Sequence, residues 1–131
     1  MESINVRVPV VIKAKLTEKL KARMIDELTK MAEQMDLEIK QINLDRQREL
    51  DAHPEQGEQI VRFFGNEIGM RQQRRAEALG RKETLVKLAI GAEIVQGNLE
   101  RQIELKVGDN FREVMNVEVL IEDDKVVAIR G

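Results

Sequence analysis

Residues 17–51 form a run of 35 positions that contains neither glycine nor proline. Within this run, and one residue before it, apolar side chains recur at steps of mostly three or four, which places them on one face of a helix. These positions are Leu16, Leu20, Met24, Leu28, Met31, Met35, Ile39 and Ile42. The run predicts a helix beginning near Thr17 that is too long to be buried in any domain that this chain can build.

A second helix is predicted from about Pro54 to about Leu88. Pro54 suits the first turn of a helix, because its missing N–H would have no partner there. Two long helices joined by a turn near residues 51–57 form an antiparallel hairpin, in which the numbers of facing residues sum to roughly 110. Arg71 and Arg75 then lie opposite Ile39 and Met35, and the acids within reach of these arginines are Glu33, Asp36 and Glu38. We therefore expect an antiparallel coiled-coil hairpin over residues 16–90.

Both ends of the chain carry the alternating pattern of strands. Apolar residues occupy every second position from Ile4 to Ile12, and period two with β-branched side chains is typical of a strand. Four further strands are expected at 92–96, 99–107, 117–121 and 125–130, separated by the turn residues Gly97-Asn98, Gly108-Asp109-Asn110 and Asp123-Asp124. Because a lone strand is not stable, residues 1–15 must join residues 91–131.

The expected fold class is therefore α+β. A long antiparallel helical hairpin is inserted into a small five-stranded antiparallel β-barrel or sheet.

The composition excludes several kinds of chemistry. The chain has no Cys, which rules out disulfides, thiolate metal sites and a cysteine nucleophile. Its one imidazole, His53, lies at the predicted hairpin turn, and no hydroxyl residue has a His nearby in sequence. No glycine-rich phosphate motif follows a strand. We expect a protein that is not an enzyme and that holds no metal or cofactor.

Charge is unevenly distributed along a chain whose formal net charge is only −2. Residues 71–87 carry net +4 and residues 88–131 carry net −4. The basic stripe of the second helix consists of Arg71, Arg74, Arg75, Arg81 and Lys82. Such a stripe suits either RNA phosphates or acidic side chains of the first helix or of another copy. We favour the structural pairing, because no aromatic residue stands among the arginines to stack on bases.

Acidic residues surround the predicted hairpin turn: Asp45, Glu49, Asp51, Glu55 and Glu58. A metal-holding tip is one interpretation, and the solvation of an exposed turn is the other. We favour solvation, which is the usual role of charges in a loop.

The helix face lined by methionine and isoleucine is more apolar than one partner helix requires. Methionine-rich surfaces adapt to different partners, so we expect a homo-oligomer or a partner protein bound through the hairpin. The residues expected to make this contact are Met24, Leu28, Met31, Met35, Phe63 and Phe64. The expected function is non-enzymatic protein–protein interaction or scaffolding, and the alternative is an accessory factor that binds RNA or a ribonucleoprotein.

Short motifs in the last third of the chain resemble the YlqD family of small bacterial proteins. They are Leu88-Ala89-Ile90-Gly91-Ala92-Glu93 leading into Gly97-Asn98-Leu99, then Leu105-Lys106-Val107-Gly108-Asp109-Asn110-Phe111, and the closing Ile121-Glu122-Asp123-Asp124-Lys125-Val126-Val127. The resemblance implies a strand before a long helical hairpin, a C-terminal β part and a bacterial setting. It implies no activity, cofactor or catalytic residue. No apolar run is long enough to span a membrane and no signal-peptide core is evident, so we expect a cytoplasmic protein.

Overall fold

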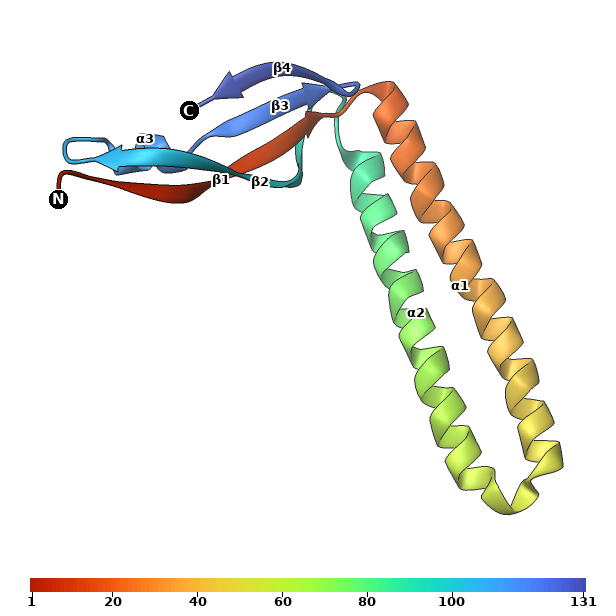
Figure 1. The fold of residues 1–131 in the computed structure, drawn as a ribbon. Helices are drawn as coiled ribbons and strands as arrows, with labels where there is room; N and C mark the ends of the chain where they lie inside the picture. Colours follow the sequence, from red (N-terminus) through yellow and green to blue (C-terminus); the bar gives the residue numbers. More distant parts are fainter. The chain divides into compact units, whose positions relative to one another are not determined.

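The structure, a computed structural model, describes residues 1–131 as two compact units. The sheet unit comprises Met1–Lys21 and Leu88–Gly131, and the helical unit comprises Ala22–Lys87. The elements follow the order strand, two helices and three strands, with short helices at two of the connections (Figure 1). The α+β class is therefore confirmed, and the two parts are described one at a time.

Helix α1 (Glu18–Ala52) and helix α2 (Gly57–Lys87) form the helical unit, joined by the 3₁₀ turn η1 (Pro54–Gln56). Pro54 stands in the first turn of η1, where its missing N–H costs no hydrogen bond. The two helices run antiparallel, as Figure 1 shows. Their buried side chains are Ala32 and Met35 on α1, and Ile60, Ala78 and Leu85 on α2. An ion pair between Asp36 and Arg75 connects the helices, which agrees with the predicted register.

Four strands form one mixed sheet in the order β2-β1-β3-β4. Strand β1 (Ser3–Lys15) pairs antiparallel with β2 (Glu93–Lys106) and parallel with β3 (Glu118–Glu122), and β3 pairs antiparallel with β4 (Lys125–Arg130). The sheet is open, with β2 and β4 at its edges. The long strand β1 is thus the element that holds the unit together.

The expectation of a five-stranded antiparallel barrel is wrong in three respects: the strand count, the closure and the direction of one pair. Gly97-Asn98 is not a turn between two strands, because β2 continues through it. The pairing register with β1 shifts there, since Ile12 pairs with Gly97 and Lys13 pairs with Val95, which leaves Gln96 as an extra residue. A glycine inside a strand often marks such a bulge. Strand β2 ends beside Ser3, and the chain then passes to the other side of β1 and enters β3 beside Val11, so that β3 runs in the same direction as β1.

Helix α3 (Phe111–Met115) lies where only a turn was expected. Its cap is Asn110, whose Oδ1 accepts a hydrogen bond from the N–H of Glu113 at 3.1 Å. The β3–β4 connection follows the prediction, because Asp123 and Asp124 both adopt positive φ. Positive φ at both central residues is typical of a type I′ hairpin turn.

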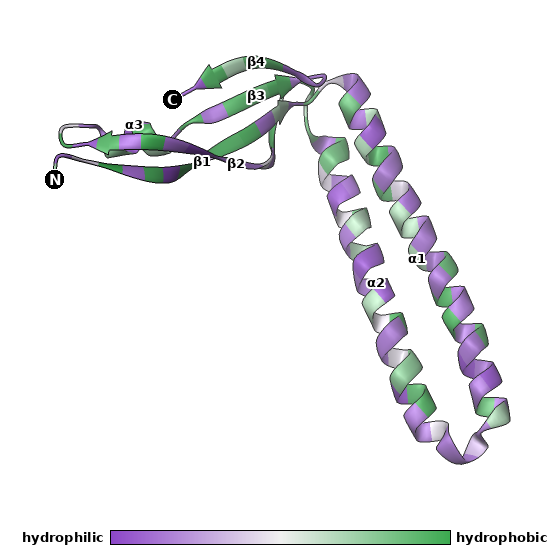
Figure 2. Cartoon of the chain, viewed as in Figure 1, coloured by the Kyte–Doolittle hydropathy of each residue, from purple (hydrophilic) through white to green (hydrophobic).

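The hydrophobic core of the sheet unit is small. Its buried apolar residues are Val8, Val10, Ala14 and Leu16, all from β1 or the residue after it. No residue of β2, β3 or β4 is buried, although hydrophobic residues occur along all four strands (Figure 2). The sheet therefore leaves much of its apolar surface uncovered within its own unit.

Candidate functional site

A hollow of about 600 Å³ lies between α1 and α2 near the hairpin turn. Side chains of both helices line it: Asp45, Arg48 and Glu49 from α1, and Gln59, Ile60, Phe63 and Phe64 from α2. We call this set the tip hollow. Ile60 is buried at its base, whereas 60% of Phe63 is exposed. The tip hollow thus combines an apolar floor with charged walls.

The two phenylalanines of the tip hollow contact each other edge to face. Their ring centroids lie 5.1 Å apart with an interplanar angle of 86°, which is a favourable arrangement for aromatic pairs. Phe64 is half-buried and supports Phe63 from within the helical unit. Met70, two helical turns after Phe63 on the same flank of α2, is 46% exposed. Asn66 and Glu67, one turn after Phe63, separate these two apolar side chains on the flank.

The charged wall of the tip hollow is acidic on balance. Arg48 Nη1 lies 4.0 Å from Asp45 Oδ1, one helical turn earlier. Glu49 forms no ion pair, so the α1 wall carries a net negative charge. The tip hollow would therefore favour a ligand that carries both apolar groups and positive charge.

The residues expected to mediate self-association fall into three environments. Met35 is buried inside the helical unit and presents almost no surface. Met24, Leu28 and Phe64 are half-buried. Met31 and Phe63 are exposed by 49% and 60% of their surfaces. The methionine-lined face is thus largely used within the hairpin, and Phe63, which lines the tip hollow, is the most exposed of the six residues.

The basic stripe is partly neutralised. Arg75 Nε lies 2.8 Å from Asp36 Oδ1 on α1, and Arg71 pairs with Glu67 one turn earlier on its own helix. Arg74 and Arg81 are exposed and form no ion pair, and Lys82 is half-buried. Arg74 and Arg81 are seven residues apart, so they share one face of α2.

The hairpin turn holds no metal-binding constellation, since no three His, Cys, Asp or Glu side chains converge in the protein. His53 lies at the N-cap position of η1 without a side-chain cap bond, and its Nδ1 is 3.5 Å from Glu55 Oε1. Asp45 and Asp51 instead accept hydrogen bonds from Gln41 and Gln47 on the same helix.

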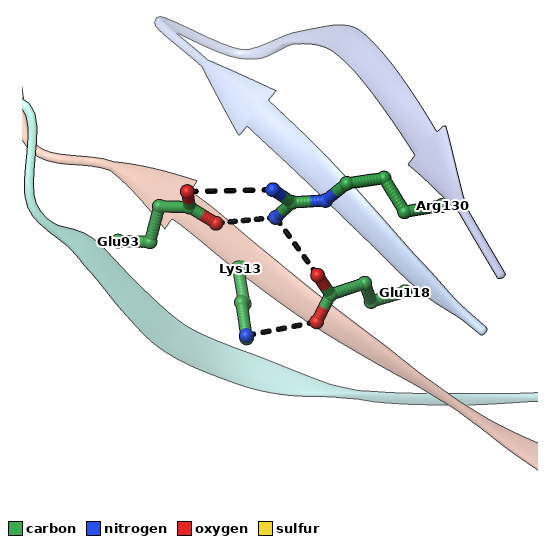
Figure 3. Close-up of polar contacts among 4 residues, drawn as sticks. All are labelled: Lys13, Glu93, Glu118 and Arg130. Carbon is green, nitrogen blue, oxygen red and sulfur yellow. Dashed lines mark hydrogen bonds and ion pairs between the residues drawn. The ribbon is translucent and has the colours of Figure 1, made fainter. Parts of the chain in front are cut away.

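A charged network crosses one face of the sheet (Figure 3). Glu118 of β3 stands between two cations: its carboxylate lies 2.8 Å from Lys13 Nζ and 2.9 Å from Arg130 Nη2. The same guanidinium of Arg130 pairs with Glu93 on β2. The hydrogen bond that Arg130 donates to Glu93 lowers the pKa of Glu93, and the same bond raises the pKa of Arg130. The network links all four strands on this face.

Sequence reasoning missed this network for a topological reason. Lys13 and Glu118 are 105 positions apart and meet only because β1 and β3 pair in parallel, with Val11 beside Glu118. The acidic wall of the tip hollow was visible as a cluster of carboxylates near the turn, but its proximity to Phe63 depends on the register of the hairpin. For the charged network, the one signal in the sequence was that Val117, Val119 and Ile121 alternate with Glu118 and Leu120, which places Glu118 on the face opposite the valines.

No helix of the protein has both the length and the apolar character needed to cross a membrane. A crystal structure of a protein of unknown function from Synechococcus sp. WH 8102 is similar, with a TM-score of 0.87 and 21% sequence identity over 98% of this chain and 97% of that chain. This likeness shows the fold. No curated protein matches the chain.

The sequence model of the YlqD protein family matches residues 4–130. The match spans β1, both long helices and the three later strands. It confirms the resemblance found in the turn motifs of the last third of the chain. The protein belongs to the YlqD family.

Proposed function

We propose that the protein acts without catalysis, by binding another protein at the tip hollow of its helical hairpin. The observation that carries this proposal is the exposure of Phe63, 60% of whose surface meets solvent beside a hollow floored by Ile60 and Phe64. An aromatic residue that is fixed by its neighbours and exposed is typical of interface hot spots. It is also costly to leave uncovered in water.

The charges around Phe63 specify the kind of partner. Asp45 and Glu49 form the acidic wall, and Arg48 is engaged by Asp45. The partner that fits is a protein segment that inserts an apolar side chain beside Phe63 and places Lys or Arg against the α1 wall. Charge complementarity of this kind sets specificity and association rate more than affinity.

The hydroxyl groups support a non-catalytic role. Thr29 and Thr84 donate to backbone carbonyls one turn earlier in their helices, Ile25 O and Gly80 O. Thr17 donates to Asp123. Each of these hydroxyls therefore has a structural partner and no neighbouring imidazole to activate it.

A photo-crosslinking amino acid at position 63 tests the proposal in a host cell, with the same substitution at Val61 as the matched control. Val61 is 50% exposed but lies off the hollow. We expect one protein to crosslink at 63 and not at 61. The purified partner should then bind Phe63→Ala at least tenfold more weakly than Val61→Ala. Equal crosslinking at both positions, or none at 63, would contradict the proposal, and so would crosslinking to a second copy.

A second candidate function is RNA binding by the basic stripe. It is favoured by Arg74 and Arg81, which share one exposed face of α2 and lack acidic partners. It predicts RNA binding that weakens steeply with salt. The double variant Arg74→Glu/Arg81→Glu should then lose RNA affinity at least tenfold, while Arg62→Glu, whose wild-type side chain pairs with Glu58, should not. RNA affinity unchanged by the double variant would exclude this function.

A further inference from the structure

The interior of the helical hairpin is unevenly packed along its length. Most of its buried side chains lie in the half that contains the two ends of the helical unit, which we call the root section: Ala32, Met35, Ala78 and Leu85. Near the turn only Ile60 is buried. Residues 36–52 of α1 and residues 61–77 of α2 contain no buried side chain. The seam between the helices is therefore filled at its two ends and thin in the middle.

Charged side chains occupy most of the interior positions of this thin middle. The Asp36–Arg75 pair fixes the register, so that residues 38–46 of α1 face residues 65–73 of α2, and we call these two segments the polar layer. The half-buried residues of the polar layer are three isoleucines and five charged residues: Ile39, Ile42, Ile68, Glu38, Asp45, Arg46, Glu67 and Arg71. The polar layer therefore gains little from the burial of apolar surface.

Three of these charged side chains hold a polar atom away from water without a hydrogen-bond partner. The atoms are Oε2 of Glu38, Nε of Arg46 and Nε of Arg71, and no other side chain in the buried and half-buried parts of the protein has such an atom. Arg71 bonds to Glu67 through Nη1, but Glu67 lies one turn earlier on the same helix. An unpaired buried group destabilises the closed seam and regains hydrogen bonds to water when the seam opens.

No polar contact across the seam compensates for these unpaired atoms. The ion pair of Asp36 with Arg75 lies at the border of the polar layer toward the root section. From there to the turn, the ion pairs and side-chain hydrogen bonds stay within one helix, as between Gln41 and Asp45 or between Glu67 and Arg71. The two helices are therefore held together in the polar layer only by half-buried isoleucines.

Two glycines weaken α2 in the same segment. Gly65 and Gly69 stand inside the helix, where glycine is the least favourable residue apart from proline. A Cβ added at either position would meet no atom within 4 Å. Close packing therefore does not require these glycines, and their effect is to make this part of α2 easier to open.

We propose that the polar layer is an opening point built into the hairpin, at which α1 and α2 part reversibly while the root section and the turn stay packed. Opening hydrates the three unpaired atoms and gives up only the contacts of half-buried isoleucines. Local opening of this kind occurs where few apolar contacts hold a segment. The proposal concerns the motion of the free protein and does not depend on the function proposed for the tip hollow.

Residue-resolved amide hydrogen exchange of the full chain, followed by NMR, tests the proposal. We expect the protection factors of residues 40–45 and 67–72 to be at least tenfold lower than those of residues 61–64, which lie nearer the turn. They should also be at least tenfold lower than those of residues 78–85 in the root section. Fraying from the turn predicts a different order, because residues 61–64 would then exchange faster than the polar layer.

A double variant identifies the cause of the opening. Glu38→Leu/Arg71→Leu removes two of the unpaired atoms and adds apolar groups to the seam, so the protection factors of the polar layer should rise at least tenfold. The matched control is Glu33→Leu/Arg74→Leu, which makes the same changes on the same two helices. Glu33 and Arg74 are exposed, so this control should leave the polar layer unchanged.

A milder variant covers the case in which the double variant does not fold. Arg46→Met keeps an apolar stem and removes the unpaired Nε, and it should also raise protection in the polar layer. Lys40→Met, at an exposed position of the same helix, should not. Protection that falls steadily from the root section to the turn, or that is as high in the polar layer as in the root section, would overturn the proposal. Protection that neither Arg46→Met nor a folded double variant raises would do the same.

Discussion

Arg75 Nε lies 2.8 Å from Asp36 Oδ1, and this contact joins the two antiparallel helices at one level of the hairpin. The residue numbers sum to 111, which agrees with a fold-back point near residue 55. The side chains are about half exposed, at 44% and 51%. Solvent therefore screens the pair, and its value lies more in fixing the register than in raising stability.

The first prediction concerns the energy of this pair. A double-mutant cycle with Asp36→Ala and Arg75→Ala should give a coupling free energy of about 0.2–1 kcal/mol, measured by urea unfolding. Arg74→Ala in place of Arg75→Ala is the matched control and should show no coupling to Asp36. A coupling above about 2 kcal/mol would mean that the pair is far better shielded from water than its exposure indicates.

The second prediction concerns glycines inside α2. A Cβ added at Gly80 meets no atom within 4 Å. Gly80→Ala should therefore raise the free energy of unfolding by about 0.5–1 kcal/mol, because alanine restricts the unfolded chain and favours helix.

Gly91 provides the contrast to Gly80. It also has open space around it but adopts φ +95°, which is unfavourable for a residue with a Cβ. Gly91→Ala should thus lower the free energy of unfolding in the same denaturation experiment. Stabilisation at both positions, or at neither, would contradict this explanation.

The third prediction concerns Thr17, whose hydroxyl has two partners. It accepts a hydrogen bond from the N–H of Leu20 at 3.1 Å, which caps α1, and it donates to Asp123 Oδ1 in the β3–β4 turn at 2.8 Å. Thr17→Ala should cost about 1–2 kcal/mol of stability in thermal or urea unfolding. Thr84→Ala is the control, since that hydroxyl bonds only to Gly80 O within its own helix. It should be neutral or slightly stabilising.

The fourth prediction concerns acid stability. The hydrogen bond from Arg130 lowers the pKa of Glu93 in the folded protein below its unfolded value. The unfolded chain therefore takes up a proton at this carboxyl at a higher pH than the folded protein does. The contribution of Glu93 is complete at neutral pH and is lost as the pH falls from about 5 to below the folded pKa.

The variant Glu93→Gln tests this linkage. Its free energy of unfolding should depend less on pH between about pH 5 and about pH 3 than that of the wild type. Both proteins should show the same slope between about pH 6 and about pH 8. Glu100→Gln is the matched control, because Glu100 is an exposed residue of the same strand without an ion pair. A flattened acid limb in the control as well would show that the effect does not belong to the Glu93–Arg130 pair.

The helical part was predictable because helix periodicity is a local property. The steps of three and four from Leu16 to Ile42, with no interruption before His53-Pro54, are sufficient to define a long helix and its turn. The position of that turn places Arg75 opposite Met35, within reach of Glu33, Asp36 and Glu38, and the structure pairs it with Asp36. The same local logic identified Asp123-Asp124 as a tight hairpin turn, where both residues adopt positive φ.

Only the tertiary structure decided how the strands are arranged. Alternation in β1 shows which residues share a face, but it does not state that β3 pairs with β1 in parallel or that the chain bulges at Gln96. Such pairings join residues far apart in the sequence, and several orders satisfy the same pattern. The sequence alone therefore determined a long helical hairpin between β segments. The fold determined that Lys13, Glu93, Glu118 and Arg130 meet on one face of the sheet. It also determined that much apolar surface of the sheet stays uncovered within its own unit, and that Phe63 stands exposed beside an acidic wall. Each of these features depends on contacts between elements.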